Sequence, residues 1–242
     1  MKDVEQIKKK VRALPKYGTH IRGFPPEVSK HIKRLLWKNL RTHFSLVECL
    51  EILIKIWPRS RKLVAKYPLA VKMLEEYGPQ ARKEFPVFGG LFIVLSEKLG
   101  DRRKAYNEVI RPFMNDLGEI SMPVLYEVDK LEKMDDPFEA FKEYNFGMLG
   151  NDPLYPIDEF IDNGNHFRFR IQKCIQNDIA KAFGIDEMAE VGCDHDCFAY
   201  PLIEDRVNTV FRRPETLAKG GSCCDFNFYR KGTEPKGPFE NK

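Results

Sequence analysis

Cysteines, carboxylates and one histidine gather in the last third of the 242-residue chain. Five of the six cysteines follow residue 173, and the segment 193–197 contains two of them beside Asp194, His195 and Asp196. A thiolate that attacks an electrophilic carbon, with a carboxylate or imidazole to move protons, uses these side-chain types. We therefore expect any chemistry of the chain to lie in this part.

The first chemistry that fits is nucleophilic catalysis. Cys193 and Cys224 are the candidate nucleophiles, and Asp196 or His195 is the candidate base. Cys174, which directly follows an expected strand, is a further candidate. Each cysteine also has a plain structural interpretation as a small apolar residue of the core. The surrounding ionisable groups favour a functional interpretation, because such groups are costly to bury without partners.

The second chemistry is metal binding, with zinc or iron as the cofactor. Cys193, His195, Cys197 and one of the pair Cys223 and Cys224 are permissible zinc ligands. Alternate residues share a face only in an extended segment, so this set requires residues 193–197 to be extended. The spacing also differs from that of the usual zinc knuckles. The nucleophilic interpretation needs no cofactor, so the sequence leaves the cofactor open.

Elements that would position these residues change in character near residue 150. Before it, apolar residues recur at helical spacing and predict a helical part over residues 1–150. Pro58 and Gly78 are expected to end helices, and Gly100 and Asp101 to cap them. The helices are expected at residues 28–44, 44–57, 59–77, 85–99, 101–117, 121–133 and 137–148.

After residue 150 the pattern becomes that of strands. Residues 166–171 alternate between apolar and polar side chains, as in a half-buried strand. Residues 208–213 and 225–229 are two more strand candidates, and residues 174–183 suggest a short helix. We therefore predict an α+β fold with a helical N-terminal part (1–150), followed by a small antiparallel sheet with short helices (151–242).

Composition indicates an ordinary globular protein, with 43% hydrophobic and 31% charged residues. No apolar stretch approaches the roughly 20 residues that span a bilayer, and the first residues lack the apolar segment of a signal peptide. A cytoplasmic, reducing location without a membrane partner is the expectation. In such a compartment clustered cysteines indicate metal binding or thiol chemistry more often than disulfides.

Charge is unevenly distributed along the chain. Residues 1–66 carry 17 Lys or Arg against 5 Asp or Glu, although the whole chain has a net charge of only +4. A basic segment can bind nucleic acid or anionic lipid, or it can simply be a solvated surface. The aromatic-rich basic motifs of RNA-binding modules are absent, so nucleic acid is not the expected partner. The apolar helical part is also compatible with a homodimer.

Several short motifs of the last third occur together in one known family. They are the strand exit that leads to Cys174, the helix end at Gly184, the pair Cys193 and Asp196, residues 212–220, and the closing segment 224–228. Through them the chain resembles the L-2-amino-thiazoline-4-carboxylic acid hydrolase family, with a weaker similarity back to residues 88–100. The chain departs from the family pattern at His195, Cys197 and Cys223, which are additional residues, and this departure leaves open a metal site peculiar to this member.

The resemblance implies a hydrolase that opens a small cyclic amidine at a carbon–nitrogen bond. Cys174, Cys193, Asp196, Cys224 and Asp225 fall on the family pattern. A substrate of this kind carries a carboxylate, which a planar guanidinium can hold through two hydrogen bonds. The arginines expected to do so are Arg168, Arg170, Arg212 and Arg213.

Two other classes of function remain open from the sequence. A sensor-type protein would use the same thiols to hold a metal or a metabolite without turnover. A nucleic-acid-associated protein would act through residues 1–66, and its binding would weaken with salt.

Overall fold

The computed structural model describes residues 26–149 and 154–242, which form two compact units. Of these residues, unit 1 contains 119–149, 154–174 and 196–242, and unit 2 contains 26–118 and 175–195. A division into domains at residue 150 stays a prediction. None of the described helices combines the length and the apolar character needed to cross a membrane.

Unit 2 is helical. Its elements are α2 (Pro26–His43), α3 (Leu46–Lys66), α4 (Pro68–Tyr77), α5 (Pro79–Leu99), α6 (Arg102–Ala105), the π-helix Tyr106–Ile110, α10 (Ile175–Ala182) and the 3₁₀ helix Asp186–Ala189. Helices α3 and α5 approach closely at Gly90, where an added Cβ would lie 2.7 Å from the carbonyl oxygen of Ile56. The buried residues Leu91 and Leu95 of α5 then fill the core beside this contact.

Three of the four predicted end and cap signals of unit 2 are confirmed, although α4 and α5 begin at Pro68 and Pro79 and not at residues 59 and 85. Gly100 adopts a left-handed conformation (φ 69°) after α5, and the Asp101 side chain accepts a hydrogen bond from the Lys104 backbone at 2.6 Å. Gly78 ends α4 as predicted. The expected end at Pro58 is wrong, because α3 continues through it to Lys66. The proline removes the hydrogen bond to the carbonyl of Ile54, and both Pro58 and Ile54 lie on the exposed side of α3.

Unit 1 is built on a four-stranded antiparallel sheet with strand order β1-β2-β4-β3. The strands are β1 (Ile157–Asp162), β2 (His166–Ile171), β3 (Thr209–Arg212) and β4 (Cys224–Arg230). The helices are α8 (Val128–Leu131), α9 (Pro137–Leu149) and the 3₁₀ helices Tyr200–Leu202 and Leu217–Lys219, while α7 (Arg111–Leu125) and α11 (Glu190–Ala199) run across the boundary between the units. The predicted α+β fold and all three predicted strands are confirmed, and β1 is an additional strand.

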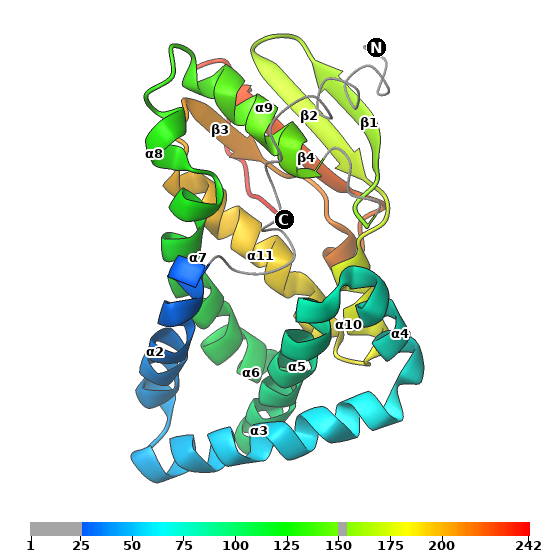
Figure 1. Cartoon of the computed structure of the whole chain (residues 1–242). Coiled ribbons are helices and arrows are strands. Elements are labelled where there is room, and N and C mark those ends of the chain that lie inside the picture. The colour runs from blue at the N-terminus through cyan, green and yellow to red at the C-terminus, as the bar shows by residue number, and fades with distance from the viewer. Residues whose placement is uncertain (1–25, 150–153) are drawn as a thin grey trace. The chain divides into compact units, whose positions relative to one another are not determined.

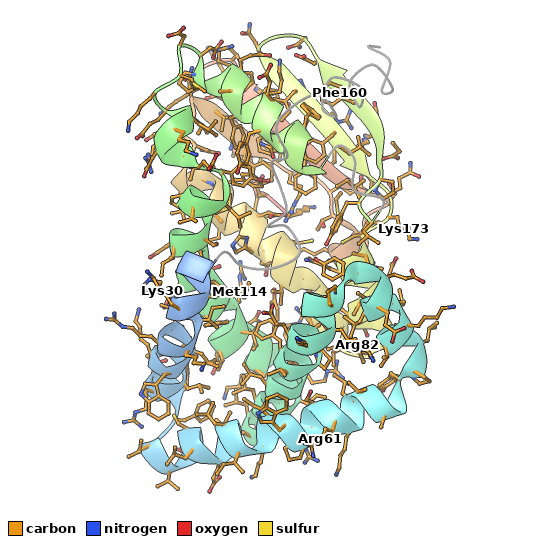
Figure 2. All side chains as sticks on the ribbon, viewed as in Figure 1. Lys30, Arg61, Arg82, Met114, Phe160 and Lys173 are labelled. Atoms are coloured by element: carbon orange, nitrogen blue, oxygen red, sulfur yellow. The ribbon has the colours of Figure 1, made fainter. Side chains whose placement is uncertain are left out.

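Helix α9 covers one face of the sheet (Figure 1). Alternation along β2 buries Phe167 and Phe169 on this face, where Phe167 stacks on Phe228 of β4 at 4.7 Å between ring centroids. Phe160 of β1 meets Phe146 of α9 edge-on at 4.3 Å (Figure 2). We call this side of the sheet the apolar face, and the opposite side the polar face.

Candidate functional site

Adjacent cysteines at the start of β4 belong to different surroundings. Cys224 pairs with Ile171 and alternates in step with Phe226 and Phe228, which places it on the apolar face. Cys223 precedes it and lies with Asp225 on the polar-face side, where its thiol is 3.8 Å from a Glu215 carboxylate oxygen. Burial, followed by the charge of Glu215, raises the pKa of the Cys223 thiol. The two thiols therefore have different chemistry.

The Cys224 thiol is buried against two hydrogen-bonding groups. The Thr216 hydroxyl lies 3.3 Å from Sγ, and the Leu217 backbone N–H donates to Sγ at 3.5 Å. Both groups come from the short segment that begins the 3₁₀ helix Leu217–Lys219. The Leu217 N–H donates to the sulfur, and the Thr216 hydroxyl is a second hydrogen-bonding partner, so these two groups fix the position of Sγ.

Asp196 of α11 pairs with an arginine that is completely buried. Arg213 Nη1 lies 2.9 Å from an Asp196 carboxylate oxygen, and Arg213 Nη2 donates to Cys197 Sγ at 2.9 Å. The same guanidinium lies over the Phe226 ring at 5.4 Å. Since Phe226 and Cys224 share the apolar face, the Asp196–Arg213 pair and the Cys224 thiol lie on the same face of the sheet.

Cys197 differs from Cys224 in its environment. Burial raises the pKa of its thiol to about 11, although the Arg213 charge acts in the opposite direction. The thiol also donates to the Lys242 carbonyl oxygen at 3.4 Å. Cys197 therefore stays a protonated thiol near neutral pH and is part of the packing around Arg213.

Two buried tyrosines lie near Asp196, and neither was predicted from the sequence. Tyr126 donates to Asn145 Oδ1 at 3.2 Å, and the hydroxyls of Tyr126 and Tyr200 form a hydrogen bond. Burial, followed by the Asp196 charge, raises the pKa of Tyr200. Tyr200 directly follows the end of α11, four residues after Asp196, so helical spacing from Asp196 is the signal that would have indicated it.

The polar face of the sheet holds three of the four predicted arginines. Arg168 donates two hydrogen bonds to the Asp225 carboxylate, from Nε at 2.6 Å and from Nη2 at 2.9 Å. Arg170 donates to Glu159 at 2.9 Å. Arg212 lies over the Phe239 ring at 5.2 Å. The predicted site residues of unit 1 are thus divided, with Cys224, Asp196 and Arg213 on one face and these three arginines on the other.

The remaining candidates lie at other places. Cys174 is partly exposed just after β2, and Cys193 is buried in the part of α11 that belongs to unit 2. In unit 2 the buried Asp194 accepts a hydrogen bond from the Tyr106 hydroxyl at 2.9 Å and pairs with Arg111 at 3.3 Å. Tyr106 was not predicted, and no local sequence signal links it to Asp194, 88 residues away.

The expected metal site depends on a conformation that the chain does not adopt. Residues 193–197 form a turn and a half of α11 instead of an extended segment, so Cys193 and His195 point to different sides of the helix. Among the residues that the structure describes, no group of three or more His, Cys, Asp or Glu side chains could hold a metal ion. The structure thus gives no support to the ligand set His195, Cys197 and Cys223.

Comparison of the chain with known protein families indicates a hydrolase. Residues 80–228, more than half of the chain, match the L-2-amino-thiazoline-4-carboxylic acid hydrolase family. The chain therefore belongs to this family, which confirms the resemblance found in the sequence. Neither the curated proteins nor the solved structures contain a match to the chain.

Proposed function

We propose that this member of the family opens the ring of a small cyclic amidine such as 2-amino-thiazoline-4-carboxylate, with Cys224 as the nucleophile. The observation that carries the proposal is the pair of groups held against Cys224 Sγ, the Thr216 hydroxyl and the Leu217 N–H. They hold the sulfur in a fixed position, from which it can attack without a cofactor. The family match to residues 80–228 supports a hydrolytic reaction.

In the first step Cys224 Sγ bonds to ring carbon 2 of the substrate. The thiol proton passes through the Asp196 carboxylate to the ring nitrogen, and the bond between carbon 2 and this nitrogen breaks. The substrate reacts as its amidinium, so the ring nitrogen already carries one proton and leaves as a neutral amine when the exocyclic nitrogen supplies the electron pair that expels it. The enzyme then carries the opened substrate as a covalent adduct on Sγ.

In the second step water replaces the enzyme sulfur. Asp196 accepts a proton from the attacking water and returns it as Cys224 Sγ leaves carbon 2. The net reaction adds one water molecule and gives an S-carbamoyl amino acid with a free α-amino group. Arg213 is the positioning residue for Asp196 in this scheme, because its buried guanidinium fixes the carboxylate at 2.9 Å.

The substrate carboxylate needs a cation on the same face as Cys224. Arg168, Arg170 and Arg212 are on the polar face and have partners there. Lys219 follows Thr216 by three residues, and its charge acts on Cys197 beside Arg213. We assign binding of the substrate carboxylate to Lys219 in this scheme. The polar-face arginines then order the sheet, and Arg213 orders Asp196.

The test uses 2-amino-thiazoline-4-carboxylate, the purified full-length protein and detection of the ring-opened product by mass spectrometry. Cys224→Ser is expected to lower kcat by at least about 1,000-fold, because a serine hydroxyl has no comparable anionic form at neutral pH. Cys223→Ser is the matched control, since its thiol lies on the other side of the strand, and it should keep activity within about threefold.

A covalent adduct on Cys224 in quenched wild-type reactions would give direct support. Equal activity of Cys224→Ser and the wild type would overturn the nucleophile assignment, and loss only in Cys193→Ser would transfer it to Cys193. Binding of the substrate or of a metal at one equivalent, with no product from any variant, would instead favour the sensor-type alternative.

A further inference from the structure

Helix α3 exposes a continuous row of large apolar side chains. Leu46, Val47, Leu50, Ile54 and Trp57 are between 50% and 73% exposed. The opposite side of α3 faces the core of unit 2 through its buried residues, among them Cys49, Ile52 and Ile56. We call the five exposed residues the α3 stripe. An exposed apolar row of this size on one helix is typical of an interaction surface.

Spacing within the α3 stripe matches a helix–helix seam. Val47, Leu50, Ile54 and Trp57 follow one another at intervals of three, four and three residues, which is the repeat of paired helices. The exposed Arg61 continues the row at the next interval of four and marks its polar end (Figure 2). A row with this repeat fits along a second helix that presents the same repeat.

We propose that the α3 stripe is the contact between two copies of this chain, with their α3 helices antiparallel about a two-fold axis between Leu50 and Ile54. This axis sets Leu50 against Ile54 of the second copy, and Val47 against Trp57 of the second copy. Each apolar residue then meets another, and each contact occurs twice, as in an isologous dimer.

Charges beside the α3 stripe are complementary in this arrangement. Glu51 and Lys55 stand one helical turn apart on the same side of the stripe. The two-fold axis brings Glu51 to within about 3 Å, along the helix direction, of the level of Lys55 in the second copy. Two symmetric ion pairs therefore flank the seam. A parallel pairing about a two-fold axis would place these flanks on opposite sides of the seam, so Glu51 of one copy would not meet Lys55 of the other.

The charge pair also distinguishes a second copy from a lipid surface as the occupant. An anionic membrane would attract Lys55 and Arg61 but repel Glu51, whose carboxylate borders the stripe. A second copy gives both signs of charge a partner. Glu51 already contacts Lys98 of its own chain at 3.4 Å, and it is exposed enough to be shared between the two lysines.

The first test is sedimentation velocity of the full-length protein over a range of concentrations. The 28.2 kDa chain is expected to sediment as a dimer at high concentration. The expected Kd is on the order of 1–10 μM, because one helix pair buries less surface than a standard stable interface. Ile54→Glu should raise Kd by about 100-fold or more, since it places two charges in the seam. Leu69→Glu, at an equally exposed apolar residue of α4, is the control and should leave Kd unchanged.

The second test is a charge exchange that reports the antiparallel pairing. Glu51→Lys and Lys55→Glu should each raise Kd about tenfold, and the chain with both substitutions should return to within about threefold of the wild type. A monomer at every concentration would overturn the proposal. A dimer that Ile54→Glu leaves intact, or single charge variants that the double variant fails to restore, would overturn it as well.

Two other occupants would give different outcomes, and each would also overturn the proposal. A monomer that binds phosphatidylserine vesicles through Ile54 would identify a lipid surface. A monomer whose melting temperature falls in Ile54→Glu would indicate that the chain's own residues cover the stripe. Activity is not the readout here, so failure of this proposal is separate from failure of the proposed chemistry.

Discussion

Side chains are buried on both faces of the sheet in unit 1, by aromatic packing on the apolar face and by hydrogen bonds on the polar face. On the apolar face, phenylalanine rings from β2, β3 and β4 stack under α9, and Phe228 contacts Phe167, Phe211 and Tyr200 at 4.7–5.1 Å between centroids. On the polar face, Asp225 and Asn227 are also nearly buried, but hydrogen bonds from Arg168 and His166 cover them.

The position of a residue along its strand decides which face it lies on, and so which environment a polar side chain meets. Asp225 meets a paired arginine and is held in place by two hydrogen bonds. Cys224, one position earlier, enters the apolar layer, where the Thr216 hydroxyl and the Leu217 N–H are hydrogen-bonding neighbours of its sulfur. Two adjacent residues of β4 are therefore held by different means, one by an ion pair and the other by neutral hydrogen-bonding groups.

The largest expected effect distinguishes the two faces by stability. Phe228→Ala is expected to lower the free energy of unfolding by about 3–5 kcal/mol, because it removes a fully buried ring and leaves a cavity. Tyr229→Ala, at the next residue on the polar face, should cost no more than about 1.5 kcal/mol, since its ring is partly exposed against His166. Urea denaturation measures both, and equal costs would contradict the assignment of one face to packed rings and the other to hydrogen-bonded polar side chains.

Strands were predictable wherever their alternation was undisturbed. In β2 every second residue is buried, so the period of two was visible in the sequence. In β1 the pairing with β2 shifts between Ile157 and Glu159, and the buried residues Ile157 and Phe160 therefore stand three apart. A spacing of three does not predict a strand. It results from the irregular pairing of β1 with β2, which depends on the tertiary structure and is not visible in the sequence.

The site was predictable in its residue types and not in its contacts. Cys224 and Asp196 were identified from side-chain chemistry and lie on the same face of the sheet. The metal-site hypothesis required residues 193–197 to be extended, but they belong to α11. Long-range pairs such as Asp194 with Tyr106 hold the helix there, and a single sequence does not reveal partners that lie far apart in the chain.

A smaller effect tests the ion pair of the polar face. Arg168→Met should lower the free energy of unfolding by about 2–3 kcal/mol, because it leaves the nearly buried Asp225 carboxylate with only the more distant Arg170, at 3.7 Å. Asp225→Asn in the Arg168→Met background should then cost less than it does in the wild type. Chemical denaturation of the four proteins gives this coupling, and additive effects would show that the pair contributes no specific stability.

The smallest expected effect is a pH dependence that belongs to the polar face alone. Burial lowers the pKa of His166 from 6.5, although its hydrogen bond to Asn227 acts in the opposite direction. The unfolded chain therefore binds this proton at a higher pH than the folded one. Stability from His166 is complete above pH 6.5 and is lost as the pH falls from there toward the folded-state pKa. Because the ring is partly exposed, the loss between pH 7 and pH 5 should stay below about 1 kcal/mol.

His166→Gln isolates this contribution, since the titrations of all other groups cancel in the difference between variant and wild type. We expect the stability difference between the two proteins to shrink as the pH is lowered from 7 to 5, in urea unfolding at fixed ionic strength. A difference that grows instead would mean that the imidazolium is the form that the folded state prefers. The polar face would then stabilise a cation at this position through Asp225, and the hydrogen-bonded neutral ring would not be its resting state.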